Sequence, residues 1–238
     1  MKKICRRYRK PQVIGIIGGS GSVKATLCQE VIKFCNEDIV LLSQDSYFKD
    51  FGQLSQAKRN AINFEHTDAI DAFLLLSHLQ SLKQSASIEV PEYDFATHSR
   101  SGRVRVLHSA SIIIVEGILL FALPQIRALY DYRVFVHMGT DKRFIRRMRR
   151  DIKLRGANVR SAVRQYLGPI KPRYNRYTLA RSATADLIIN GLNLRNALKQ
   201  ISNFITTIQE NNYETKNIYS YAVLQPRTFF GINNSKHP

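Results

Sequence analysis

Short runs of aliphatic residues alternate along the chain with stretches in which apolar residues recur at helical spacing. The runs predict buried strands at residues 13–17, 39–42, 112–115, 134–136 and 187–189. The run at 112–115 contains no polar residue, as is typical of a strand that is covered on both faces of its sheet. Helical spacing predicts helices at residues 24–36, 68–83 and 193–208.

Alternation of strand and helix is typical of an α/β fold with a parallel, doubly wound sheet. We therefore expect residues 13–210 to form one such domain, preceded by a basic arm at residues 1–12. Residues 211–238 are rich in Asn, Tyr and Ser and show no clear periodicity. They predict a surface tail or a partly ordered extension.

Ligands of doubly wound sheets bind beyond the carboxyl ends of the strands. Three candidate features directly follow predicted strands: the glycine-rich loop at residues 18–23, Asp45 and Glu116. We expect all three to lie on the same edge of the sheet.

The net charge of +18 is unevenly distributed along the chain. Residues 1–10 carry six Lys or Arg and no acid, and residues 141–181 carry fourteen against only Asp141 and Asp151. The rest of the chain sums to zero. The arm and the basic segment therefore indicate anionic ligands, which are either the phosphate groups of a small molecule or nucleic acid.

An odd number of cysteines, three, and the lack of a Cys-x-x-Cys pair favour a reducing compartment and a cytoplasmic location. Cys28 and Cys35 share one face of a predicted helix, as small core residues would. No apolar run reaches the roughly 18 residues of a transmembrane helix, so no membrane contact is expected. The N-terminus resembles a signal peptide, but its apolar part is short and broken by glycines.

The stretch "IIGGSGSVKAT", residues 16–26, is similar to a phosphate-binding loop, in which Gly is followed by four residues, Gly, Lys and a Ser or Thr. Gly18 and Lys24 are in place, but Val23 replaces the second glycine and Ala25 replaces the hydroxyl residue that normally holds Mg²⁺. Thr26 is the nearest hydroxyl, rotated by about 100° around the helix. The local pattern leaves a working loop and an ordinary glycine turn both open.

Further stretches follow in a fixed order: "LLSQDSYFKDF", "NFEHTDAID", "VPEYDFATHSR", "IIIVEGILLF", "RRMRRDIKLRG" and "RQY". Together they closely resemble the uridine/cytidine kinase family, in the phosphoribulokinase-like branch of P-loop kinases, from about residue 13 to residue 204. The resemblance implies a P-loop fold with a basic lid, and transfer of the γ-phosphoryl of ATP (or GTP) to the 5′-hydroxyl of uridine or cytidine in pyrimidine salvage. It also implies Mg²⁺ and allows a homo-oligomer, either a tetramer or a dimer.

The resemblance also assigns roles to residues at the phosphate end. Asp45 matches the general base beside the 5′-hydroxyl, although a lone acid after a strand also suits a helix cap. Glu116 matches an acid near Mg²⁺, which Asp45 would help to bind. Arg150 and Arg155 match lid arginines that close on the phosphates. The loop would bind the nucleotide through residues that the motif places together: Gly18, Gly19, Ser20, Gly21, Ser22, Lys24 and Thr26.

At the nucleoside end, the resemblance places Tyr93, Phe95 and His98 in the pyrimidine pocket. Tyr93 and Phe95 are two apart, so in an extended segment they share a side and can flank a flat base. The ribose-binding residues would be Glu65, Arg147 and Gln165. Glu65 stands where the family pattern "NFDHP" has Asp, and its extra methylene could crowd or move the sugar.

Two other functions stay open. Val23 and Ala25 also suit a catalytically impaired relative that binds pyrimidine nucleosides or nucleotides as a sensor or scaffold. The basic arm could bind RNA without sequence preference. Because the sequence shows no known RNA-binding motif, nucleic acid is not an expected partner.

Overall fold

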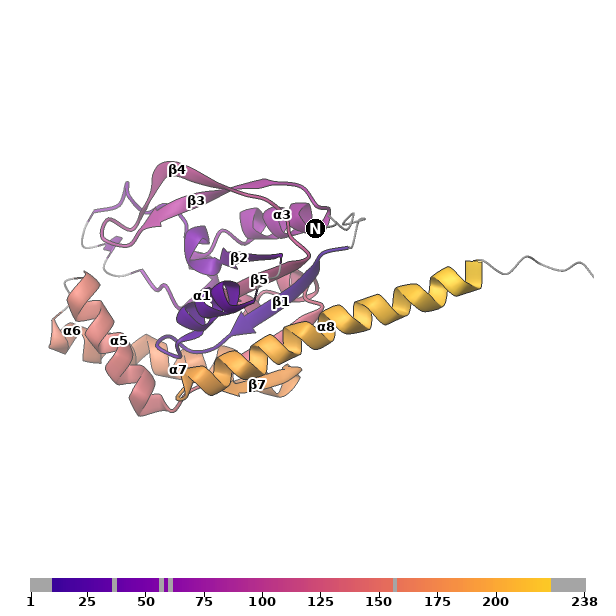
Figure 1. Cartoon of the computed structure of the whole chain (residues 1–238). Coiled ribbons are helices and arrows are strands. Elements are labelled where there is room, and N and C mark those ends of the chain that lie inside the picture. The colour runs from indigo at the N-terminus through magenta and orange to yellow at the C-terminus, as the bar shows by residue number, and fades with distance from the viewer. Residues whose placement is uncertain (1–9, 36–37, 56–57, 60–61, 156–157, 224–238) are drawn as a thin grey trace, which may run out of the picture.

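A parallel five-stranded sheet forms the centre of the computed structural model (Figure 1), which describes residues 10–35, 38–55, 58–59, 62–155 and 158–223. The strand order is β2-β5-β1-β6-β7, with every neighbouring pair parallel. The bounds are β1 Gln12–Ile17, β2 Ile39–Ser43, β5 Ile112–Gly117, β6 Tyr132–His137 and β7 Leu187–Asn190. The predicted α/β fold is thus confirmed, with β1 in the middle.

Helices cover both faces of this sheet. Helices α1 (Lys24–Phe34) and α8 (Leu194–Val223) pack on one face through apolar residues that include Leu27, Val31 and Ile201. Helix α3 (Ala72–Lys83) covers the other face, where Leu75 and Leu79 are fully buried. The central strands are apolar on both faces because each face is buried by a different layer.

An antiparallel hairpin of β3 (Ile88–Asp94) and β4 (Ser99–Leu107) lies outside the central sheet and appears at the top of Figure 1. The end of the hairpin next to its turn is tied to α3, because Arg100 of β4 forms a 3.0 Å ion pair with Asp71, which caps that helix. The hairpin supplies the segment that contains Tyr93, Phe95 and His98.

The basic segment forms a helical region between β6 and β7, where the lid was predicted. It begins with α5 (Thr140–Arg155) and α6 (Val159–Gln165), at the lower left of Figure 1. Four short helical segments follow: η4 Tyr166–Ile170, α7 Lys171–Arg173, η5 Tyr174–Thr178 and η6 Leu179–Thr184. The remaining short helices are η1 Gln44–Tyr47, η2 Thr67–Ala69, η3 Leu120–Ala122 and α4 Pro124–Arg127.

Two predicted helices differ from the observed ones. The helix expected at 68–83 is split, because Ile70 pairs with Phe48 in a β-bridge and Asp71 then starts α3 by accepting a hydrogen bond from the Leu74 amide. Helix α8 runs to Val223 and projects beyond the sheet in Figure 1, so no break in secondary structure occurs at residue 210.

The structure describes the cysteines at residues 28 and 35 but not the two ends of the chain. Residues 1–9 of the basic arm and 224–238 of the tail lie outside the described residues. Cys28 is buried in the core, and the half-buried Cys35 lies 3.5 Å from the Ser202 hydroxyl of α8. Within the part of the chain that the structure describes, no helix is both long and apolar enough to cross a bilayer.

Candidate active site

The glycine-rich loop joins β1 to α1 at the carboxyl edge of the sheet. Gly21 has a φ of +84°, and a Cβ there would lie 2.5 Å from the Arg143 carbonyl oxygen, so a side chain is excluded on both grounds. Val23 also adopts the left-handed region, with φ 67° and ψ 8°, directly before the helix starts at Lys24. The chain therefore keeps the turn that the missing glycine would allow, at the cost of backbone strain in a β-branched residue.

Lys24 and Glu116 meet behind the loop. The Lys24 Nζ lies 4.0 Å from Glu116 Oε2, and both side chains are buried. The Ser43 hydroxyl, at the end of β2, donates a 2.5 Å hydrogen bond to Glu116 Oε1. Burial raises the pKa of Glu116, the Lys24 ammonium lowers it, and the nearby Asp45 carboxylate raises it further.

The three features predicted for one edge of the sheet are thus brought together. Asp45 is exposed in η1, immediately after β2, and its charge acts on Glu116 at the end of β5. The carboxylates of Asp45 and Glu116 and the hydroxyl of Ser43 supply oxygen atoms, which are the ligands that Mg²⁺ prefers. Ala25 offers no oxygen in its side chain, and both Ala25 and Thr26 are exposed on the first turn of α1.

Helix α5 presents arginines to both ends of the site. Arg147 forms a 2.6 Å ion pair with Glu65, each side chain being 11% exposed. One turn later, Arg150 Nη2 donates a 3.4 Å hydrogen bond to the Ser20 hydroxyl of the phosphate loop. Arg155 ends α5, and its side chain lies outside the described residues. Gln165 is exposed at the end of α6, so its ribose contact stays a prediction.

Aromatic rings cluster where the pyrimidine pocket was predicted. Tyr93 and Phe95 contact each other edge to face, with centroids 5.2 Å apart, and both pack on Phe48. They do not face each other across a gap, because β3 ends at Asp94 and Phe95 belongs to the turn. The His98 ring stacks on Phe64, with centroids 4.6 Å apart.

Phe48 and Phe64 are therefore cluster members that the sequence reasoning did not single out. The signal was present, since both lie inside the quoted stretches "SQDSYF" and "NFEH" beside assigned residues.

A third missed residue is Arg143, which is 1% exposed beneath the phosphate loop. Its Nε donates a 3.1 Å hydrogen bond to the Met138 carbonyl oxygen, and its guanidinium lies 3.5 Å from the centre of the Tyr174 ring. A Cβ at Gly19 would lie 2.2 Å from Arg143 Nη1. Arg143 and Tyr174 thus pack against the underside of the loop. The backbone passes so close to them at residue 19 that only glycine fits there.

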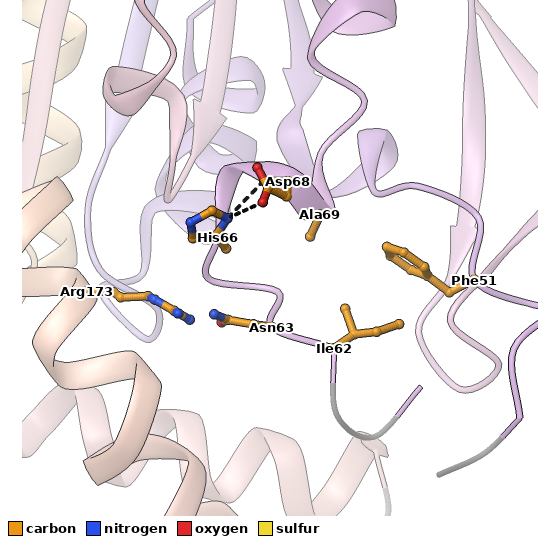
Figure 2. Close-up of a pocket in the computed structure, with 7 residues that line it drawn as sticks. All are labelled: Phe51, Ile62, Asn63, His66, Asp68, Ala69 and Arg173. Carbon is orange, nitrogen blue, oxygen red and sulfur yellow. Dashed lines mark hydrogen bonds and ion pairs between the residues drawn. The ribbon is translucent and has the colours of Figure 1, made fainter. Parts of the chain in front are cut away.

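A cavity of about 400 Å³ borders the nucleoside end of the site (Figure 2). Its walls contain none of the residues predicted for the site, but Asn63 and His66 flank Phe64 and Glu65 in the chain. In Figure 2 the Arg173 side chain of α7 points toward Asn63. The lining residues are Phe51, Ile62, Asn63, His66, Asp68, Ala69 and Arg173.

Comparison with known proteins agrees with this geometry. The sequence profile of the phosphoribulokinase / uridine kinase family matches residues 13–197. The chain belongs to this family. It is 43% identical over 182 residues to a uridine kinase of Clostridium perfringens, which covers 76% of this chain and 88% of that protein. A uridine kinase of Lactobacillus helveticus is 43% identical over 185 residues, covering 77% and 88%.

The fold is likewise shared with solved kinase structures. A possible uridine kinase from Bacillus stearothermophilus superimposes with a TM-score of 0.55 at 17% identity, covering 78% of this chain and 91% of that one. At this identity the likeness concerns the fold alone. Membership of the kinase family rests on the sequence match, and it explains why the loop, Asp45 and Glu116 meet at one edge.

Proposed function

We propose that this family member is a uridine kinase, which transfers the γ-phosphoryl group of ATP (or GTP) to the 5′-hydroxyl of uridine or cytidine. The observation that carries the proposal is the meeting of Lys24, Glu116 and Asp45 at the carboxyl edge of the sheet. Such a site combines a cation for phosphate with carboxylates for a metal and for a proton. Relatives at 43% identity that are named uridine kinase support the choice of substrate.

The reaction follows from the places of these groups. The 5′-oxygen attacks the γ-phosphorus, the bond to the β,γ-bridging oxygen breaks, and Asp45 accepts the proton of the hydroxyl. Lys24 and Arg150 stabilise charge on the phosphate oxygens during transfer, because both border the loop. Mg²⁺, when bound through Glu116 and Asp45, would neutralise further phosphate charge.

The nucleoside would bind between the hairpin and α5. The aromatic cluster offers apolar surface to the base, while Glu65 and Arg147 offer an acceptor and a donor to the ribose hydroxyls. In the structure these two groups bind each other, so a ribose must share or replace that ion pair.

The direct test is a kinase assay with full-length protein, Mg-ATP and uridine or cytidine, in which the monophosphate is quantified by chromatography. We expect product formation that falls at least about a hundredfold in Lys24→Ala, because the point charge on the phosphates is lost. Equal rates in both proteins would contradict the proposal.

A nucleoside-binding protein without transfer activity is the second candidate, favoured by the lack of a hydroxyl at Ala25. The double variant Val23→Gly/Ala25→Thr separates the two. Val23 already adopts the left-handed turn in the natural chain. We therefore expect the kinase activity of the double variant to stay within about tenfold of that of the natural chain. Activity that appears only in the double variant would favour the second candidate.

A further inference from the structure

Asp151 of helix α5 is a buried carboxylate, 5% exposed, whose two oxygens bind two different arginines. Its Oδ2 lies 3.2 Å from Arg147 Nε. Its Oδ1 accepts hydrogen bonds from Arg150 Nε at 3.1 Å and from Arg150 Nη2 at 3.0 Å. Asp151 therefore holds the arginine of the nucleoside end and the arginine of the phosphate end at once.

Each of these two arginines also contacts a residue at its own end of the site. Arg147 Nη1 lies 2.6 Å from Glu65 Oε1, beside the aromatic cluster. Arg150 Nη2 also donates to the Ser20 hydroxyl in the phosphate loop, at 3.4 Å. A continuous chain of polar contacts thus runs from Glu65 through Asp151 to Ser20, and Asp151 is its midpoint.

We propose that Asp151 is a positioning residue that couples nucleoside binding to nucleotide binding by sharing its carboxylate between Arg147 and Arg150. The proposal rests on the function proposed above. Sequence alone gave no role to this residue, which counted only as an acid in a basic segment. The structure distinguishes it from Asp141, the other acid of that segment, which is exposed in the first turn of α5.

The direction of the coupling follows from charge. Bound triphosphate attracts Arg150 toward the loop and weakens its hold on Asp151. The carboxylate then interacts more strongly with Arg147, whose guanidinium becomes more firmly oriented toward the ribose. By linkage, nucleoside binding strengthens nucleotide binding by the same factor.

The test is a set of calorimetric titrations of the full-length chain with uridine and with cytidine, each without and with saturating Mg²⁺ and the non-hydrolysable ATP analogue AMP-PNP. In the natural protein we expect the nucleoside to bind about tenfold more tightly when AMP-PNP is present. In Asp151→Asn we expect the two affinities to agree within about twofold. Asp141→Asn, which removes the same charge from the same helix, should retain the tenfold effect.

The ratio of affinities separates positioning from a merely structural role, because a general loss of stability lowers both affinities and leaves their ratio unchanged. Should Asp151→Asn unfold at the assay temperature, Asp151→Glu replaces it, and its longer side chain should reduce the ratio. Equal affinities in the natural protein, or a ratio retained in both Asp151 variants, would overturn the proposal alone. If neither nucleoside binds at all, the proposed function fails as well.

Discussion

Glu116 is a carboxylate whose burial makes ionisation costly, and Lys24 and Ser43 offset that cost only in part. Its folded-state pKa is therefore higher than the pKa in the unfolded chain. A residue with this property suits a metal site, because a cation brings the charge that favours the ionised form. Val23 shows a similar local cost at the loop, where a strained φ of 67° retains the left-handed turn.

Glu116 should make the free energy of unfolding depend on pH. A carboxyl with a raised folded-state pKa stabilises the fold fully below its unfolded value of about 4.5, and this contribution is lost as pH rises through the folded-state pKa. Glu116→Gln lacks the contribution. Without metal, the free energy of unfolding of the natural protein should therefore fall relative to Glu116→Gln as the pH rises above about 4.5, as measured by urea unfolding.

Glu30→Gln is the matched control, because the Glu30 side chain is 40% exposed on α1. It removes an exposed carboxylate of the same kind, so the difference between the two variants isolates the effect of burying Glu116. A constant difference for Glu116→Gln would show that burial does not shift the titration of this carboxyl.

At the scale of elements, the site depends on short contacts that fix where one helix or strand begins relative to another. Asp71 illustrates this, because its two oxygens act on different elements. Oδ1 accepts a 3.1 Å hydrogen bond from the Leu74 amide at the start of α3, and Oδ2 pairs with Arg100 of β4 at 3.0 Å. One side chain therefore starts the helix and also ties the hairpin of β3 and β4 to it.

Substitutions at Asp71 should separate these two contributions. Asp71→Ala removes both the cap and the ion pair, so the free energy of unfolding should fall by about 1–2 kcal/mol. Asp71→Asn keeps an oxygen for the cap and loses only the charge, so the loss should stay below about 1 kcal/mol. Urea unfolding measures both values, and equal losses would show that the cap contributes nothing.

At the scale of the whole molecule, sequence pattern predicted the central sheet well, because apolar runs such as 112–115 depend on burial that the sheet itself supplies. It could not find the break at Ile70, since that break depends on a bridge to Phe48, which is distant in sequence. The positions of Glu116 and Asp45 directly after predicted strands indicated that both would lie on one edge of the sheet. Sequence pattern did not give the burial of Arg143 or of Asp151, because the burial of a side chain on α5 depends on how the predicted lid packs on the loop.

The last prediction concerns the carboxyl boundary of the domain. Ile201, Ile205 and Ile208 of α8 are at most 2% exposed and pack on one face of the sheet. Removing a buried isoleucine costs roughly 2–5 kcal/mol, and a domain of this size is stable by only about 5–15 kcal/mol. A chain that ends at Leu198 should therefore be unfolded at 25 °C, as judged by circular dichroism and thermal melting.

A chain that ends at Glu210 is the matched control, because it keeps all three isoleucines. Its free energy of unfolding should lie within about 1 kcal/mol of that of the full chain, since the three buried isoleucines of α8 are retained. A larger loss would show that residues beyond 210 belong to the folded domain, and would move its boundary toward the end of the helix at Val223.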